Sequence, residues 1–293
     1  MVRVPPSTHA PDPLIDVRRL SSRDRLLLSW LAEHYVLTTE QIATALFPSL
    51  RYAQKRLTLL HRIQAVSRFA FARTEDECGS YRYTLGTLGA RLYPTTFTDP
   101  DNPAVRPPRT HLERRARIMR SPRLGHLLGV NQFFIDLYAH ARSRPGAELA
   151  RWWSEQHATG AYGSTGVRPD GHGIWRTQAD TVGFFLEYDN NTEGLPRVLG
   201  KLAAYERLPE FGPRYPVLLW VPDLRRETSL LRALAGVPTR VPVATGVHGA
   251  NPAGPVWALP DNPQRRLALH QLPSDHGPDA KTNPSYFPDH GPE

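Results

Sequence analysis

The second half of the chain is decided by one stretch, Thr181-Val182-Gly183-Phe184-Phe185-Leu186-Glu187-Tyr188-Asp189. An apolar run of this length predicts a buried strand over 181–189. Glu187 and Asp189 are two residues apart, so their side chains share one face of that strand, with Tyr188 on the other. Carboxylates in a buried sheet need partners, so this pair indicates a site. The alternative is that both acids cap the loop at 190–194.

Acids also accompany the two strands predicted before this one. A strand at 166–176 contains Arg168-Pro169-Asp170-Gly171, and a strand at 148–157 carries Glu155. Asp170, on the neighbouring strand, can converge on the face that bears Glu187. Two alternatives stay open, because Asp-Gly is a common turn dipeptide and Glu155 could be a surface acid.

A candidate cation follows on the next element. The pattern predicts a helix over 195–208 with Lys201 on it, then a strand at 215–221, a helix at 227–235 and a strand at 241–245. Oxygen ligands suit a hard divalent cation, which polarises a phosphoryl group and activates water. We expect Mg²⁺ held by Asp170, Glu187, Asp189 and Glu155, with Lys201 stabilising phosphate charge. Lys201 could instead extend along its helix into solvent. We expect Tyr205 to pack. His126 and His157 are candidate ligands or general bases, but lone histidines more often make local hydrogen bonds, and we expect that of both.

The first half predicts three short helices followed by a hairpin. Helices are expected from Ser21, from Thr38, where Gln41 completes a capping box, and over 49–64. Strands are expected at 66–73 and 81–85. This order is typical of a winged helix-turn-helix module.

Basic residues are placed where such a module would contact DNA. The third helix would enter the major groove, and the hairpin would hold phosphate or enter the minor groove. The candidate DNA-binding residues are Arg51, Tyr52, Lys55, Arg56, Thr58, Arg62, Arg68, Arg73 and Arg82. The alternatives are an ordinary solvated surface or a protein-binding winged helix.

These patterns predict an α+β chain of two domains. We expect a disordered N-terminus (1–20), a winged-helix domain (21–93), a linker (94–110), a second domain (111–248) and a Pro-rich, largely disordered tail (249–293). The linker holds five prolines, and the helical stretch 111–144 is interrupted at Ser121-Pro122.

Composition favours an anionic partner. The 293 residues include 36 Lys and Arg against 28 Asp and Glu, a formal net charge of +8. Arginine supplies nearly all of the positive charge, and it suits bidentate contacts to phosphate. The single cysteine, Cys78, excludes a disulfide within the chain and a cysteine-based zinc site. We find no signal-peptide pattern, no apolar run long enough for a bilayer, no Walker A loop and no His-Glu-x-x-His. We therefore expect a cytoplasmic protein with no membrane partner.

The second domain resembles the PD-(D/E)xK restriction-endonuclease-like fold, with an αβββαβ order of elements. Pro169-Asp170 and Glu187 match its acids, while Asp189 occupies the position of its lysine. The resemblance then implies that Lys201, on the next helix, supplies the missing cation.

The whole layout is also similar to the replication-relaxation family of actinobacterial plasmids and integrative mobile elements. The resemblance covers about residues 22–222. It is carried by Thr38–Ala43, Tyr83–Ala90, Gly125–Asn131, Arg168–Gly171, Leu186–Asp189 and Lys201–Tyr205. It implies a role in plasmid replication and DNA relaxation, with double-stranded DNA and replication or conjugation proteins as partners. Two functions stay open: a Mg²⁺-dependent nickase or endonuclease, and a non-catalytic DNA-binding factor whose nuclease-like domain is degenerate.

Overall fold

The computed structural model describes residues 18–71, 80–95, 106–191, 194–208 and 212–276. The chain is α+β and divides into two compact units, Met1–Leu124 and Gly125–Glu293. Each unit has its own core. Within the described ranges, every helix is too short or too polar to cross a lipid bilayer.

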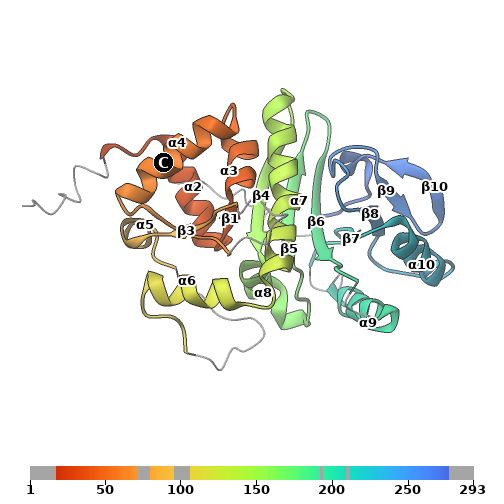
Figure 1. The fold of residues 1–293 in the computed structure, drawn as a ribbon. Coiled ribbons are helices and arrows are strands. Elements are labelled where there is room, and N and C mark those ends of the chain that lie inside the picture. The colour runs from red at the N-terminus through yellow and green to blue at the C-terminus, as the bar shows by residue number, and fades with distance from the viewer. Residues whose placement is uncertain (1–17, 72–79, 96–105, 192–193, 209–211, 277–293) are drawn as a thin grey trace, which may run out of the picture. The chain divides into compact units, whose positions relative to one another are not determined.

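The first unit combines helices with a small antiparallel sheet (Figure 1). Its helices are α2 (Ser22–Glu33), α3 (Thr39–Leu46), α4 (Leu50–Arg62), α5 (Thr87–Leu92) and α6 (His111–Arg120). Its strands are β1 (Leu37–Thr38), β2 (Val66–Phe69) and β3 (Arg82–Leu85), in the order β1-β3-β2. The expected sequence of three helices and two paired strands is therefore present.

The helix starts in this unit are fixed by side-chain caps. Ser21 and Asp24 form a reciprocal capping box at α2, and Thr38 and Gln41 form another at α3. Ser49 caps α4 by accepting a hydrogen bond from the backbone of Tyr52. Such caps satisfy backbone N–H groups that have no partner within the helix, which is why they could be predicted from local sequence.

Glycines in the segment Tyr83–Ala90 allow the chain to pass very close to the end of α4. A Cβ atom on Gly86 would lie 2.2 Å from the carbonyl oxygen of Gln64, and one on Gly89 would lie 2.2 Å from that of Ala65. The backbone of Gly86 donates to Ala65 and that of Leu88 to Gln64. Both glycines are required because any side chain would meet backbone.

The first unit extends further along the chain than expected. We placed a domain boundary in the linker 94–110, but α6 belongs to the first unit. Arg115 of α6 donates to Ser67 of β2 at 2.9 Å, and His111 lies 3.3 Å from the hydroxyl of Thr87. Side-chain contacts thus attach α6 to the first unit, although the proline-rich segment before it predicted a linker between domains.

The second unit is built on a seven-stranded mixed sheet in the order β10-β9-β8-β7-β6-β5-β4. The strands are β4 (Glu148–Ser154), β5 (Gly171–Arg176), β6 (Thr181–Tyr188), β7 (Val217–Val221), β8 (Val243–Val247), β9 (Trp257–Leu259) and β10 (Asn262–Leu267). The helices are α7 (Leu124–Ser143), α8 (Glu155–Tyr162), α9 (Leu195–Tyr205) and α10 (Leu224–Leu234), with 3-10 turns at Gly163–Thr165 and Leu269–Gln271. Strands β6, β7 and β8 are parallel, and the other neighbours pair antiparallel.

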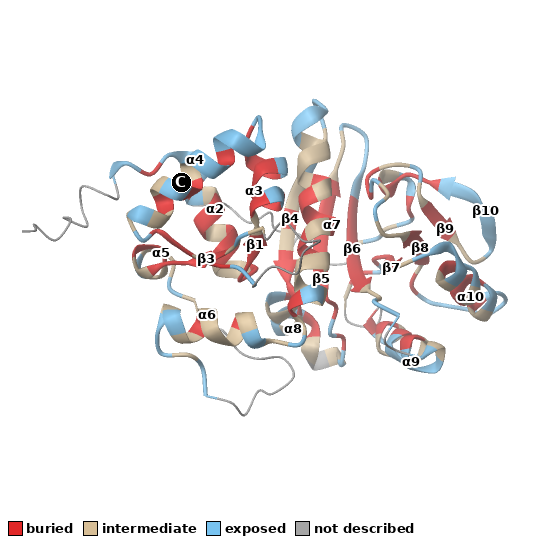
Figure 2. Ribbon diagram, in the orientation of Figure 1, coloured by how far each residue is buried: buried red, intermediate tan, exposed pale blue. Residues whose placement is uncertain are grey.

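Both faces of this sheet are covered, which explains why its central strands are buried along their length (Figure 2). Helix α7 packs on one face, where Phe133 and Phe134 meet Phe184 and Trp220. Helices α8, α9 and α10 contribute to the core on the other face, which includes Phe185. Alternate residues of β6 therefore belong to different cores, and Glu187 lies on the α9 side.

Two expectations for this unit were wrong. Glu155 does not lie on a strand, because Ser154 accepts a hydrogen bond from the backbone of His157 and begins α8 at Glu155. The stretch 249–276, part of the expected disordered tail, instead forms β9 and β10. Trp257 and Leu269 are fully buried there and add to the core under α7.

Candidate functional site

Asp170 and Glu187 come together at one end of the sheet. Gly171 of β5 is paired with Leu186 of β6, and the two acids stand one position beyond this pair. Residues opposite each other on antiparallel strands point to the same face. Asp170 Oδ2 also accepts a hydrogen bond from the backbone of Tyr188 at 2.8 Å. The predicted convergence of these acids is therefore present.

Asp170 is held in its ionised form. Its side chain is buried, and Oδ1 lies 2.9 Å from His126 Nε2 on α7. Burial alone would raise the pKa of Asp170, but the hydrogen bond and charge of His126, the backbone of Tyr188 and the charge of Lys201 together lower it. His126 was expected to make a local hydrogen bond, but its partner lies 44 residues away and is an acid of the site itself.

Glu187 tends instead to keep its proton. Burial, followed by the negative charge of Asp170, raises the pKa of Glu187 to about 8. Helix α9 brings two donors to this carboxyl group: the Tyr205 hydroxyl lies 2.6 Å from Oε1 and Lys201 Nζ lies 3.4 Å from Oε2. Lys201 and Tyr205 are one helical turn apart, so they reach the same side chain. We define Asp170, Glu187 and Lys201 as the acid site.

Tyr205 was the residue whose role we underestimated. We expected it to pack, and it is indeed buried, but its hydroxyl group is committed to Glu187. The spacing of four residues from Lys201 was the signal in the sequence that could have placed it here.

The side chain of Asp189 makes its contacts outside the acid site. Its Oδ2 lies 2.7 Å from Arg226 Nε on α10, and its Oδ1 accepts a hydrogen bond from the backbone of Asn191 at 2.6 Å. An ion pair and a turn thus account for both oxygens. Strand β6 ends at Tyr188, before Asp189, and these contacts give Asp189 a structural role rather than that of a ligand.

Comparison with models of known protein families identifies the family of this chain. A family model described as Replication-relaxation matches residues 28–217. The chain belongs to the replication-relaxation family. Neither a curated protein nor a solved structure matches it. The range shared with the replication-relaxation model contains the acid site, α4 and the β2–β3 pair, while β8, β9 and β10 lie beyond it.

The donors of the acid site suit a hard divalent cation. In the described part of this replication-relaxation protein, no group of three or more His, Cys, Asp or Glu side chains is arranged to hold a metal. Mg²⁺ is nevertheless commonly bound through one or two carboxylates, with water and phosphate completing its octahedron. The pKa of Glu187 is raised first by burial and then by the negative charge of Asp170, and a bound cation would neutralise the second of these effects. Asp170 and Glu187 would therefore be the protein ligands.

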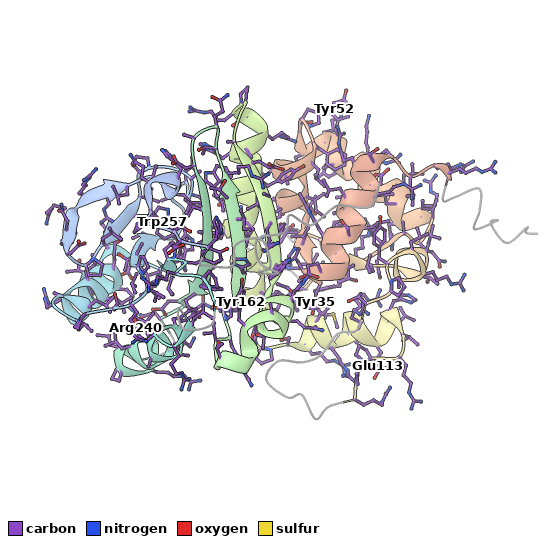
Figure 3. The ribbon with its side chains drawn as sticks, turned by 180° about the vertical axis from the view of Figure 1, so that it is seen from behind. Tyr35, Tyr52, Glu113, Tyr162, Arg240 and Trp257 are labelled. Carbon is purple, nitrogen blue, oxygen red and sulfur yellow. The ribbon has the colours of Figure 1, made fainter. Side chains whose placement is uncertain are left out.

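The first unit presents a basic stripe along α4. Ala53, Leu57 and Leu60 face its core, and the residues expected on the opposite side are exposed: Arg51, Lys55, Thr58 and Arg62. Tyr52 is 64% exposed, and Figure 3 shows its side chain pointing away from the ribbon of this unit. We call Arg51, Lys55 and Arg62 the α4 stripe.

Arg56 does not belong with these solvent-facing residues. Its guanidinium group forms an ion pair with the buried carboxylate of Asp24 on α2, with Nε 2.9 Å from Oδ1, and it also donates to the backbone of Arg19 at 3.0 Å. Arg56 therefore joins α4 to α2. The hydroxyl of Thr58 donates to the backbone of Gln54 within the helix.

The arginines of the hairpin are positioned by aromatic rings. The guanidinium carbon of Arg68 lies 4.1 Å from the ring centre of Tyr81, and that of Arg82 lies 5.0 Å from that of Phe71. Such cation–π contacts limit the directions in which these charges can extend. Arg73, the third arginine predicted on the hairpin, lies outside the described residues.

Proposed function

We propose that this protein binds DNA through the α4 stripe and the β2–β3 hairpin, and that its acid site uses Mg²⁺ to cleave a phosphodiester bond in one of the two strands. The family relationship suggests a role associated with plasmid replication. In this proposal the first unit is a winged helix-turn-helix module and the second a variant of the PD-(D/E)xK fold.

One observation carries the catalytic part: Asp170 and Glu187 are adjacent and buried on a shared sheet end, with Lys201 3.4 Å from Glu187. Bound Mg²⁺ would supply Lewis acidity and an activated water. The carboxylates of Asp170 and Glu187 would bind and orient the cation. Tyr205 would hold Glu187 in place, and Lys201 would stabilise negative charge on the phosphate.

The DNA-binding part rests on charge and exposure. The α4 stripe is exposed, and the helix that bears it packs through its opposite face. The chain has a net charge of +8, and cationic side chains gain affinity for DNA by releasing condensed counterions.

The nicking test uses supercoiled plasmid. The wild-type protein with Mg²⁺ is expected to produce open circles, and EDTA should stop the reaction. Asp170→Asn should abolish nicking, while Asp180→Asn, at an exposed acid in the turn between β5 and β6, should leave it unchanged. Nicking that survives Asp170→Asn would rule out the acid site as the source.

The binding test measures affinity for duplex DNA at several salt concentrations. Replacing Arg51 and Lys55 by Ala should weaken binding. It should also reduce the slope of the logarithm of the binding constant against the logarithm of the salt concentration by about 2, because two phosphate contacts are lost. The control is Arg120→Ala, which removes an exposed arginine from α6 of the same unit. Equal losses in the two variants would contradict a specific role for α4.

A second candidate function is supported by the Asp189–Arg226 ion pair. A non-catalytic DNA-binding factor would retain buried carboxylates for stability, with the position of the motif lysine converted to a structural acid. Salt-dependent DNA binding without Mg²⁺-dependent nicking would favour this candidate.

A further inference from the structure

A hollow of about 470 Å³ lies beside the α4 stripe in the first unit. Its apolar wall includes Phe47, Tyr52 and Leu59, and its cationic side chains are Arg23, Lys55 and Arg56. Tyr52, Lys55, Arg56 and Leu59 occupy positions i, i+3, i+4 and i+7 of α4, so they form one face of that helix. The hollow is thus lined by both apolar and cationic side chains.

No acidic residue is among the described residues that line the hollow. Arg56 is paired with Asp24 and forms a fixed part of the wall. Arg23 is exposed at the start of α2, where its guanidinium carbon lies 5.2 Å from the ring centre of Phe47, and Lys55 is exposed. Arg23 and Lys55 therefore offer positive charge to an anionic group at the rim.

The apolar wall favours a ligand that has an apolar group in addition to a phosphate. A phosphate oxygen gains nothing from aromatic and aliphatic carbon, whereas a nucleobase has an apolar face that stacks on aromatic rings. Tyr52 is 64% exposed, so its ring is open to such stacking. In a paired duplex the faces of the bases are covered by their neighbours, so only an unpaired base can use this wall.

We infer that the hollow binds one unpaired nucleotide of a DNA strand, with its base against Tyr52 and its phosphate between Arg23 and Lys55. This inference rests on the proposed DNA binding by α4, and it makes the preferred ligand a duplex with an extruded base. Tyr52 was expected in the DNA interface without a separate role, and Arg23 was not among the expected DNA-binding residues.

The experiment compares a fully paired duplex with one that carries a single bulged 2-aminopurine, both in low salt with the full-length protein. We expect the bulged duplex to bind about tenfold more tightly, because stacking on an aromatic side chain contributes at that level. The fluorescence of the 2-aminopurine should fall on binding. Tyr52→Phe should keep both effects and Tyr52→Ala should lose both.

Arg23 is tested against Arg25, another exposed arginine of α2 that does not line the hollow. Arg23→Ala should lose most of the preference for the bulged duplex, and Arg25→Ala should keep it. Equal affinity of the wild type for both DNAs, or a preference that survives Tyr52→Ala, would overturn the inference and leave duplex binding intact. Absence of salt-dependent binding to either DNA would instead overturn the proposed function.

Discussion

The hydroxyl oxygen of Tyr205 lies 2.6 Å from Oε1 of Glu187, so α9 holds a carboxyl group of the sheet whose pKa is raised to about 8. Tyr205 is buried, and its own pKa is raised well above the ordinary value by burial and by the charge of Glu187. The tyrosine therefore stays protonated and donates. This contact links the position of α9 to the charge state of the acid site.

Glu187→Gln should change how stability depends on pH. The pKa of Glu187 is about 8 in the folded protein and about 4.5 in an unfolded chain. Between these values the folded state keeps a proton that the unfolded state has lost, so this group's contribution to stability falls as pH rises from about 4.5 to 8. The variant should gain stability relative to the wild type from pH 5 to pH 8 in EDTA, as measured by chemical denaturation. Parallel curves would contradict the raised pKa.

Tyr205→Phe should destabilise the protein more at pH 9 than at pH 6. At pH 9 the carboxylate of Glu187 is ionised, and a hydrogen bond to a charged acceptor is worth about 1.5–3 kcal/mol, against about 1 kcal/mol for a neutral one. The control is Tyr52→Phe, at an exposed hydroxyl, which should have little effect at either pH. A loss that does not vary with pH would indicate that Tyr205 only fills space.

Arg56→Ala and Arg62→Ala should separate stability from binding on a single helix. Loss of Arg56 leaves the buried carboxylate of Asp24 without its cation, which should cost about 1.5–3 kcal/mol in the free energy of unfolding. Arg62 is exposed, so its loss should change stability by less than about 0.5 kcal/mol while weakening DNA binding. Thermal denaturation and DNA titration of both variants check this, and a reversed pattern would return Arg56 to the DNA interface.

Gly129→Ala and Gly125→Ala compare two glycines of α7. A Cβ atom on Gly129 would lie 2.3 Å from the hydroxyl of Tyr188, whose ring is stacked on His248 with centres 4.3 Å apart. Moving that ring should cost about 1–3 kcal/mol. At Gly125 nothing lies within 4 Å of the added atom, so alanine should be neutral or stabilising by up to about 1 kcal/mol. Calorimetric melting of the two variants gives the comparison, and equal effects would mean that Tyr188 moves freely.

The features that sequence predicted well depend on neighbours in the chain. The N-cap at Ser21 and the capping box at Thr38 involve residues three positions apart, and the break between α6 and α7 falls at Ser121-Pro122 as expected. The convergence of Asp170 and Glu187 was also predictable, because consecutive strands that pair antiparallel bring the residues at their shared end together.

The features that sequence missed depend on partners brought together by packing. Asp189 was expected to help bind a metal, but α10 supplies Arg226 to it from 37 residues away. Arg56 was expected to face DNA, but α2 supplies Asp24 from 32 residues away. Prolines in the last stretch suggested disorder, yet β9 pairs with β8 and buries Trp257.

The sequence by itself determined the three helices and the hairpin of the first unit, their caps, and the chemical types gathered at the acid site, because periodicity and capping act over a few residues. Only the tertiary structure decided which charges face solvent and which are neutralised inside. A charged side chain has the same local signature in either case, and its role depends on whether a distant element carries its counterion to within hydrogen-bonding distance.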